Sequence, residues 1–349
     1  MTKIEEGLKL DFHNVLIRPK RSTINSRNNV NLQRNFKFKN CKSLKSWEGI
    51  PIIASNMDTV GTFEVYNVLS KYKIVTALHK FYNADDFLEW KNNYNSIDPD
   101  LFMVSTGIQN HDYERLQSIM SVINCNWICI DIANGYISQL VHFCKKVREA
   151  YPDKIIVAGN VVTREIVEEL ILNGGVDIVK IGIGPGSACL TRLKTGVGMP
   201  QLSAIMECAD AAHGVGGHII ADGGITCPGD LAKAFGGGAD FVMIGGVFSG
   251  HIENPGDIIT EDGKKYKLFY GMSSKHAMEK HYGKMNEYRS SEGRVVKVPF
   301  KGHLDHTVLD YLGGLRSACT YINACCIKHM PLCTTFVQVS QQLNTYLVQ

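Results

Sequence analysis

The sequence lacks the features that would place the protein in a membrane, outside the cell or on nucleic acid. No apolar run is long enough to span a bilayer, and the first seven residues contain no apolar signal core. The formal net charge of +3 is too small for a nucleic-acid-binding surface. We therefore expect a cytoplasmic protein with neither a membrane nor a nucleic-acid partner.

Two common cofactor signatures are also absent. None of the 11 cysteines belongs to a Cys-x-x-Cys pair, and several, such as Cys129, lie inside apolar runs. Scattered thiols of this kind are typical of reduced intracellular proteins, so we expect no disulfide framework and no zinc site. No Gly-x-Gly-x-x-Gly turn follows the first predicted strand, which argues against a dinucleotide-binding Rossmann half.

Eight short apolar runs, separated by helical patterns, dominate what is present. Strands are predicted at Ile50–Ser55, Ile74–His79, Leu101–Thr106, Trp127–Ile132, Ile155–Gly159, Ile178–Ile183, His218–Ala221 and Phe241–Ile244. Helices are predicted at Thr62–Lys71, Ala84–Asn93, Tyr113–Ile123, Ile137–Glu149, Arg164–Asn173, Gln201–His213, Pro228–Phe235 and Thr307–Ala324. Eight alternating units favour an α/β fold of the (β/α)8 TIM-barrel type, with a doubly wound open sheet as the alternative.

A long polar excursion, residues 249–301, follows the last predicted strand. Its glycines, lysines and weak periodicity indicate a hairpin and a mobile flap rather than a second domain, so we expect residues 1–349 to form one catalytic domain. Arg289 and Glu292 lie in this flap. They could close over a substrate, although a solvated charged loop is the ordinary interpretation.

The strongest chemical signal is the stretch Gly184-Pro-Gly-Ser-Ala-Cys-Leu-Thr-Arg. It follows a predicted buried strand and presents a thiol, Cys189, with a hydroxyl at Thr191 and a cation at Arg192. Active sites of α/β barrels lie at the carboxyl ends of the strands, where a cysteine on a sharp loop is placed as a nucleophile. A glycine-rich connector with an incidental cysteine is the alternative.

Other strand ends add polar groups to the same side of the predicted barrel. Asp222-Gly-Gly and Gly245-Gly246 follow the last two strands, where such barrels commonly bind phosphate, although helix-start turns also use glycine. Asp131 is either a ligand-facing carboxylate or a helix cap. Lys80 is either a partner for a cofactor phosphate or a solvated charge.

Taken together, these motifs resemble the GMP reductases, within the family that also contains IMP dehydrogenase. The resemblance covers nearly the whole chain. It is carried by the cysteine loop, Lys194-Thr-Gly-Val-Gly-Met-Pro-Gln, Ala221-Asp-Gly-Gly-Ile, Gly271-Met-Ser-Ser, Tyr288-Arg-Ser-Ser-Glu-Gly and Gly313-Gly-Leu-Arg-Ser-Ala-Cys-Thr-Tyr. It implies reductive deamination of GMP to IMP and ammonia by NADPH, through a covalent thioimidate on the nucleophile, in a homotetramer that binds K⁺.

The same resemblance implies roles for individual residues. Cys189 would be the nucleophile, with Thr191 and Glu292 as the pair that handles protons. Substrate contacts would come from Ser187, Asp222, Gly223, Gly224, Gly245, Gly246, Gly271, Met272, Ser273, Arg289, Ser290, Ser291 and Gly293. Cofactor contacts would come from Ser26, Arg27, Lys80, Asp131, Ile132, Ala133, Ile183, Gly184, Met272, Tyr288, Arg289, Ser317, Ala318, Cys319 and Thr320. K⁺ would be bound at Gly184, Gly186, Cys189 and Arg192.

Two alternatives remain open at the level of sequence. One is an enzyme like IMP dehydrogenase, but the chain has no room for inserted regulatory CBS modules, and its flap sequence resembles the reductase. The other is a nucleotide-binding protein without activity, which would have no need for Cys189, Thr191 and Glu292 together. Leu190 stands where the family often has threonine, a change expected to alter packing rather than chemistry.

Overall fold

The computed structural model describes residues 4–43, 46–94, 96–283 and 290–340, and its centre is a closed barrel of eight parallel strands. The order around the barrel is β10-β11-β4-β5-β6-β7-β8-β9. The barrel strands are β4 (Ile52–Ala54), β5 (Val75–Leu78), β6 (Phe102–Thr106), β7 (Trp127–Asp131), β8 (Ile155–Val161), β9 (Ile178–Ile181), β10 (His218–Asp222) and β11 (Phe241–Ile244). Closure confirms the predicted (β/α)8 barrel over the open sheet, and each of the eight predicted strands is present.

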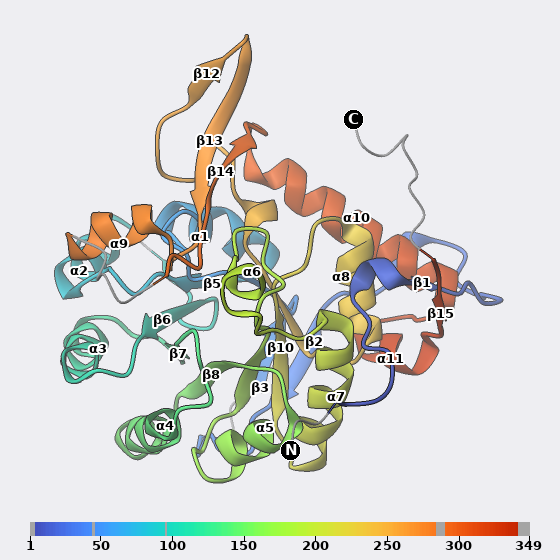
Figure 1. The fold of residues 1–349 in the computed structure, drawn as a ribbon, viewed down its shortest axis with the longest axis horizontal. Coiled ribbons are helices and arrows are strands. Elements are labelled where there is room, and N and C mark those ends of the chain that lie inside the picture. Colours follow the sequence, from blue (N-terminus) through green and yellow to red (C-terminus); the bar gives the residue numbers. More distant parts are fainter. Residues whose placement is uncertain (1–3, 44–45, 95, 284–289, 341–349) are drawn as a thin grey trace.

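Helices surround the barrel, as Figure 1 shows. They are α1 (Phe63–Leu69), α2 (Ala84–Asn93), α3 (Asn110–Val122), α4 (Ser138–Ala150), α5 (Arg164–Leu172), α7 (Gln201–Gly214), α8 (Pro228–Gly236) and α10 (Leu304–Ile322). Each coincides with a predicted helix to within a few residues. No helix among the described residues is long and apolar enough to cross a membrane.

An antiparallel hairpin closes the amino-terminal end of the barrel. It is formed by β2 (Arg34–Lys37) and β3 (Ser46–Gly49), and it buries Phe36 and Trp47. The Phe36 ring lies 4.4 Å from that of Phe241, and the Trp47 ring lies 5.7 Å from that of Trp127. Phe241 and Trp127 begin their strands, so the aromatic cluster seals this end and leaves the carboxyl end of the barrel for chemistry.

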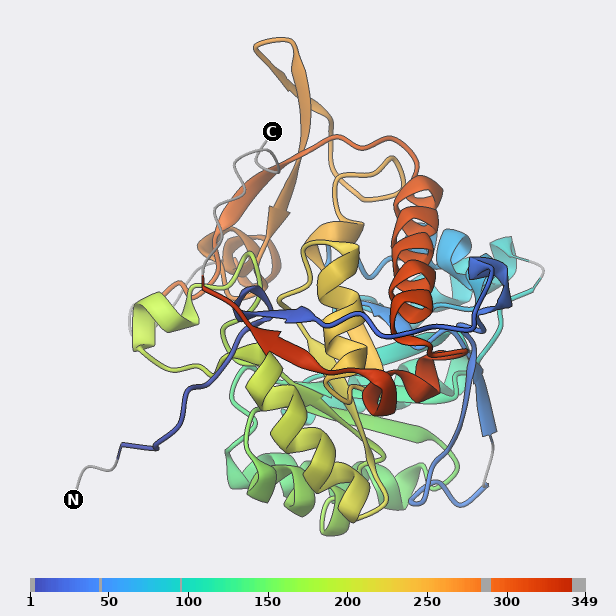
Figure 2. The same ribbon diagram turned by 90° about the vertical axis from the view of Figure 1, so that its right-hand side faces the viewer.

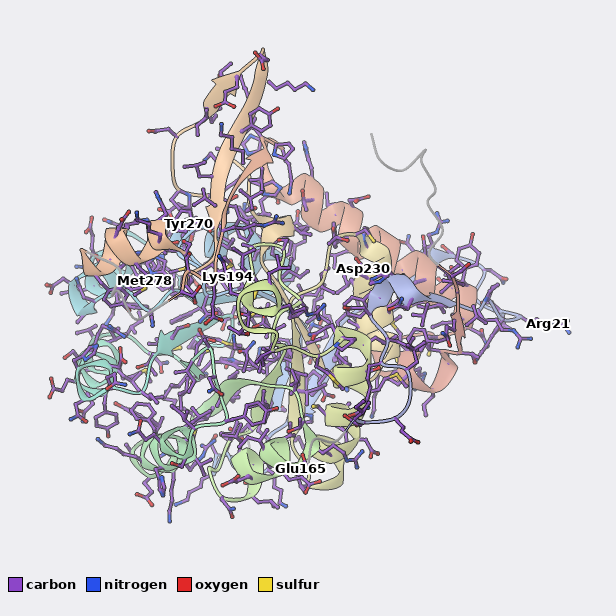
Figure 3. All side chains as sticks on the ribbon, in the orientation of Figure 1. Arg21, Glu165, Lys194, Asp230, Tyr270 and Met278 are labelled. Carbon is purple, nitrogen blue, oxygen red and sulfur yellow. The ribbon has the colours of Figure 1, made fainter. Side chains whose placement is uncertain are left out.

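The segment after β11 builds a flap beside that carboxyl end. It contains β12 (Ile259–Glu261), β13 (Lys264–Tyr270), α9 (Lys275–Tyr282) and β14 (Val295–Pro299), and its three strands form an antiparallel sheet. The β12–β13 hairpin projects away from the barrel in both ribbon views (Figures 1 and 2). Tyr270 and Met278, labelled in Figure 3, lie on the strand and helix that return toward the barrel.

A strand near each end of the described chain takes part in a two-stranded sheet on the outside of the barrel. Strand β1 (Val15–Ile17) pairs with β15 (Phe336–Gln338), and the two are side by side in Figure 2. Further along the chain from β1, the 3-10 helix η2 (Arg27–Asn29) packs against α10. Shortly before β15, the 3-10 helix η5 (Ile327–His329) leads into the short helix α11 (Met330–Cys333). These short, partly polar elements have no strong periodicity in the sequence.

Candidate active site

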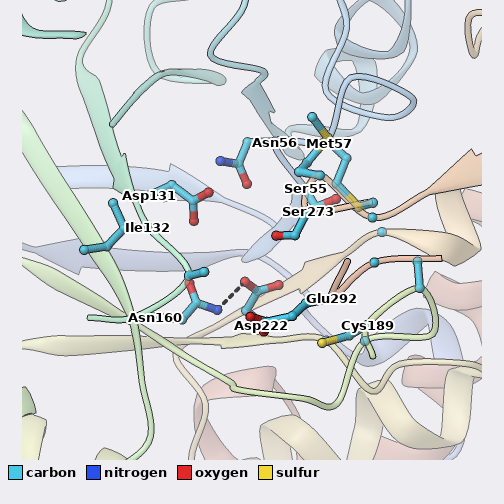
Figure 4. Close-up of a pocket in the computed structure, with 18 of the residues that line it drawn as sticks. Ser55, Asn56, Met57, Asp131, Ile132, Asn160, Cys189, Asp222, Ser273 and Glu292 are labelled. Atoms are coloured by element: carbon cyan, nitrogen blue, oxygen red, sulfur yellow. Dashed lines mark hydrogen bonds between the residues drawn. The ribbon is translucent and has the colours of Figure 1, made fainter. Parts of the chain in front are cut away.

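A pocket of about 1120 Å³ opens at the carboxyl end of the barrel. Pockets for a single small ligand are usually ~300–1,000 Å³, so this one has room for two ligand groups side by side. Figure 4 shows Cys189 and Glu292 on one side of it and Asp131 and Ile132 on the other. The hydroxyl of Ser55 and the amide oxygen of Asn160, which line the pocket, are buried without a partner among the described residues, so the wall has polar groups available for a ligand.

The loop after β9 presents Cys189 between that strand and the short helix α6 (Thr191–Thr195). Gly184 has a φ of +91°, and the Arg192 side chain packs where a Cβ at Gly184 would stand. The Arg192 guanidinium forms an ion pair with Asp11 at 3.2 Å and donates to the Met199 carbonyl at 2.7 Å. These contacts brace the cysteine loop, and they direct the charge of Arg192 toward Asp11.

Hydrogen bonds connect the thiol to a carboxylate on the flap. The Cys189 thiol donates to Thr191 Oγ1 at 3.3 Å, and the Thr191 hydroxyl donates to Glu292 Oε2 at 2.7 Å. Backbone bonds join the two loops, because Leu190 N–H donates to the Glu292 carbonyl at 2.6 Å and Arg294 N–H to the Ala188 carbonyl at 3.0 Å. The arrangement offers a path for a proton from sulfur to carboxylate.

A buried ammonium group links two carboxylates on the opposite wall. Lys180, in β9, has a side chain only 2% exposed, and its Nζ lies 2.7 Å from Asp131 and 2.9 Å from Asp222. Burial alone would lower the pKa of Lys180, but the two carboxylates raise it above its ordinary value. Burial would likewise raise the pKa of Asp131, and Lys180 lowers it below its usual range. Lys180 and Asp131 are therefore both charged at neutral pH.

Sequence reasoning does not assign a role to Lys180, although a signal was available. A lysine in the middle of a buried apolar strand needs a charged partner, because an unpaired ammonium is costly to bury. Asn160 strengthens the same cluster by donating to Asp222 at 2.8 Å, the bond drawn in Figure 4.

Glycines after β10 and β11 bring the backbone close to the pocket. Gly223 and Gly224 have φ values of +91° and +84°, a region that favours glycine. A Cβ at Gly223 would stand 3.1 Å from Pro185, and one at Gly246 would stand 2.8 Å from the Ser187 hydroxyl. Such turns expose backbone N–H groups, which suit an anion such as phosphate.

The flap helix α9 is fastened to the barrel through one buried carboxylate. Asp58, which follows β4, accepts from the Tyr270 hydroxyl at 2.9 Å, from Lys280 Nζ at 2.9 Å and from His281 Nε2 at 2.6 Å. Phe81 stacks on the His281 ring at 3.5 Å. Burial would raise the pKa of Asp58, but the bonds from Lys280 and His281 lower it overall.

We expect Asp58→Asn to loosen α9 and to raise the KM of any ligand held under the flap. A carboxylate with a lowered pKa stabilises the fold at neutral pH, and this contribution is lost as the pH falls through that lowered value. Because the Lys280 side chain is 48% exposed, the expected loss at neutral pH is modest, about 1–2 kcal/mol. Hydrogen exchange of α9 amides measures the effect, and Glu279→Gln, which removes an exposed 3.7 Å ion pair on the same helix, is the matched control. Equal protection in both variants would contradict this role of Asp58.

The structure brings most of the predicted site residues to the pocket. Those that line it are Lys80, Asp131, Ile132, Ala133, Ile183, Gly184, Gly186, Ser187, Cys189, Thr191, Asp222, Gly223, Gly224, Gly245, Gly246, Gly271, Met272, Ser273, Ser290, Glu292 and Gly293. Ser291 does not line it. Its hydroxyl accepts from Lys275 N–H and donates to the Gly293 carbonyl, so it braces the flap. Tyr288 and Arg289 lie outside the described residues.

The remaining predicted cofactor residues lie elsewhere. Ser26, Arg27 and Thr320 line a separate cavity of about 490 Å³ between η2 and the end of α10. Ser317 and Ala318 belong to α10 and line neither cavity. Cys319 also belongs to α10 and is fully buried in the core, so its predicted cofactor contact stays a prediction.

The cysteine loop also has the donor chemistry for an alkali cation. Among the described residues, no hydrogen bond is made to the carbonyl oxygens of Gly184 and Cys189. The Gly186 carbonyl accepts from Cys189 N–H at 3.0 Å, and that of Arg192 accepts from Gly196 N–H at 3.1 Å. Oxygen-only sets of this kind suit hard cations, and rings of backbone carbonyls are a known way to hold K⁺.

Comparisons with known proteins agree with this geometry. Residues 9–344 match the family model of the IMP dehydrogenase / GMP reductase domain. The chain is 56% identical to GMP reductase 2 of Mus musculus over 99% of its own length and 98% of that protein. It is 58% identical to GMP reductase of Buchnera aphidicola, covering 98% of the chain and 97% of the relative. It is 55% identical to GMP reductase of Escherichia coli, covering 98% of each.

Proposed function

Because the chain belongs to the IMP dehydrogenase/GMP reductase family, we propose that it is a GMP reductase that converts GMP to IMP and ammonia with NADPH. The observation that carries the proposal is the hydrogen-bonded series Cys189–Thr191–Glu292. A protein that only bound nucleotide would need no nucleophile connected to a carboxylate.

The walls of the pocket suit a purine nucleotide. Asp222 accepts from ribose hydroxyls, and the amides of Gly223, Gly224, Gly245 and Gly246 hold the phosphate, as in other barrels that bind phosphate after their last two strands. With the phosphate there, the purine extends toward Cys189 and places its C2 beside the sulfur.

The proton path then accounts for the reaction at C2. Cys189 passes its proton through Thr191 to Glu292, and the thiolate adds to C2 of GMP. Glu292, now protonated, returns the proton through Thr191 to the C2 amine, which departs as ammonia and leaves a covalent thioimidate. When bound, NADPH supplies the hydride that reduces this carbon. The Cys189–C2 bond then breaks, the thiolate is regenerated, and IMP is released. Overall, GMP, NADPH and one proton give IMP, NADP⁺ and ammonia.

The opposite wall would hold the nicotinamide end of the cofactor. Asp131, Ile132 and Ala133 form that wall after β7, and Lys80 adds a positive charge beside it. The Lys180 ammonium fixes Asp131 and Asp222 relative to each other, so the cofactor side and the ribose side keep a constant separation. K⁺ would be held by the carbonyls of the cysteine loop, where it would order the backbone that presents Cys189.

Assembly as a homotetramer completes the proposal. What supports it is the division of the expected cofactor residues between two cavities of one chain. A dinucleotide that touched both sets would reach from the pocket of one copy to the Ser26 and Arg27 surface of another. Light scattering on the purified protein tests the tetramer separately from the activity.

The activity test follows the absorbance of the reduced nicotinamide with purified protein, GMP, NADPH and K⁺. Loss of absorbance that requires GMP, with equal amounts of IMP and ammonia, is the expected result. Formation of reduced cofactor from IMP and NAD⁺, without the GMP reaction, would assign the chain to the dehydrogenase branch. Binding of GMP without turnover in either direction would make it a nucleotide-binding protein.

Glu292→Gln should separate the two halves of the reaction. A neutral amide cannot take up and return the proton, so ammonia release should fall by about 10²–10⁴-fold. Hydride transfer from IMP to NADP⁺ needs only the Cys189 thiolate, which the thiol can also form by losing its proton to water, so this step should be affected less. Single-turnover absorbance measures hydride transfer, and steady-state ammonia release measures deamination. Full deamination by the variant would remove Glu292 from the mechanism.

A further inference from the structure

The carboxyl end of α10 carries a concentration of thiols that the proposed reaction does not use. Four of the chain's 11 cysteines lie between residues 319 and 333, and three of them form the pattern Cys-Cys-x-x-His-x-x-x-Cys. Cys319 is buried in the core, whereas Cys325 and His329 are exposed and Cys326 is partly exposed. The last three stand on the turn that leads through η5 into α11.

This turn brings three metal-binding side chains together. Cys325 Sγ lies 3.3 Å from His329 Nδ1. One ligand atom from each of Cys325, Cys326 and His329 lies within 4.8 Å of the other two. Zinc-bound sulfur and nitrogen atoms stand roughly 3.5–3.8 Å apart, given tetrahedral bonds of ~2.3 Å to sulfur and ~2.0–2.1 Å to nitrogen. Only small rotations of these partly or fully exposed side chains are needed to reach that geometry.

The backbone of the turn is held in place from two sides. Asn31 N–H donates to the Cys325 carbonyl at 2.9 Å, and Ile327 N–H donates to the Asn31 carbonyl at 3.3 Å. His329 N–H donates to the Cys326 carbonyl at 3.1 Å within η5. The three side chains are therefore presented by a fixed backbone, which lowers the ordering cost of binding an ion.

We propose that Cys325, Cys326 and His329 bind one Zn²⁺ ion. Two thiols and an imidazole form the soft and borderline donor set that selects zinc over alkaline-earth cations, and three protein ligands with water in the fourth position is an established zinc arrangement. On binding, each thiol releases its proton to solvent, so two thiolates balance the charge of the ion and no oxidant or reductant takes part. The expectation of no zinc site rests on the missing Cys-x-x-Cys pairs, but here adjacent cysteines and a histidine one turn later supply the ligands.

A second cluster shows why composition alone does not make such a site. His213, His218 and Asp240 also lie within mutual reach of one ion. However, Asp240 already has a cationic partner. Its Oδ2 atom contacts His213, and its Oδ1 atom lies 3.4 Å from the Arg34 guanidinium. The guanidinium, in direct contact with that carboxylate, would repel a divalent cation there.

Metal content tests the proposal on the full-length protein, and it does not depend on the reductase activity. Protein reduced with a phosphine is mixed with Zn²⁺, desalted and analysed by elemental mass spectrometry. About one Zn²⁺ per chain is expected for the native sequence. The loss should be nearly complete in a Cys325→Ser/Cys326→Ser double variant and in His329→Ala.

Cys333→Ser is the matched control. Cys333 is a neighbouring cysteine whose thiol donates to the Asn323 carbonyl at 3.7 Å, so this variant should keep the metal. Co²⁺ in place of zinc should give near-ultraviolet thiolate charge-transfer absorption that disappears in the double variant. Retention of zinc by the double variant, or failure of the native protein to hold it through desalting, would overturn the proposal.

Discussion

Cys189→Ser is expected to abolish turnover while leaving nucleotide binding largely intact. Cys189 is the thiol whose proton has a direct route to a carboxylate, through Thr191 Oγ1 at 3.3 Å and on to Glu292 at 2.7 Å. Serine keeps the hydrogen bond but is a far weaker acid, so the nucleophile is not formed at neutral pH. The GMP affinity should change little, because the proposed ribose and phosphate contacts come from other loops.

The measurement pairs steady-state kinetics with intact-protein mass spectrometry after acid quench. The native protein, incubated with IMP and NADP⁺, should carry a covalent nucleotide adduct that the Cys189→Ser variant lacks. Cys227→Ser is the matched control, since this exposed cysteine caps α8 outside the pocket and should leave both signals unchanged. Near-normal turnover by Cys189→Ser would rule out covalent catalysis.

The barrel is predictable from sequence because its signals are local. Each barrel strand is a run buried on both faces and reads as nearly continuous hydrophobic sequence, such as Phe102–Thr106. Strands outside the barrel have no such signal. In β14, for example, exposed and half-buried residues alternate, and its existence depends on pairing with β13 more than 20 residues away.

The candidate site is only partly predictable, because some of its contacts join residues that are far apart in the sequence. Cys189 and Thr191 are close in sequence, so their hydroxyl–thiol pairing can be expected from the loop itself. Glu292 is 101 residues from Thr191, and only the resemblance to a family connected them before the structure showed the 2.7 Å bond. The orientation of Arg192 toward Asp11 could not be anticipated either, because Asp11 precedes the first barrel strand by about 40 residues.

Lys180 is the residue for which the structure adds most to the sequence. It stands among apolar neighbours in β9, yet it makes charged contacts with the ends of β7 and β10. The side chains of Asp131 and Asp222 are 32% and 21% exposed and line the pocket, so they remain available to ligands. The buried Lys180 ammonium contacts both carboxylates from inside the barrel. One buried cation thus fixes the two carboxylates on which the proposed cofactor and ribose contacts depend.

Lys180→Met is therefore expected to lower stability and to impair both binding sites at once. Removing one partner of a buried ion pair leaves uncompensated charge and typically costs about 3–5 kcal/mol. Without the ammonium, the two carboxylates repel each other, the pKa of Asp131 rises, and the separation between cofactor and ribose contacts is lost. The KM for GMP and the KM for NADPH should both increase, and kcat/KM should fall on the order of 100-fold, the equivalent of about 3 kcal/mol.

A double-mutant cycle with Asp222→Asn distinguishes this role from simple loss of packing. If Lys180 acts by compensating charge, neutralising Asp222 in the Lys180→Met background should recover part of the lost stability, whereas Asp222→Asn alone should be destabilising. Chemical denaturation measures the four free energies of unfolding. Additive effects, or a Lys180→Met protein with native stability and unchanged KM values, would contradict the charge-compensation role. Methionine has nearly the same length as the lysine stem, so recovery by Asp222→Asn would show that the ammonium charge, and not the volume of the side chain, organises this wall of the pocket.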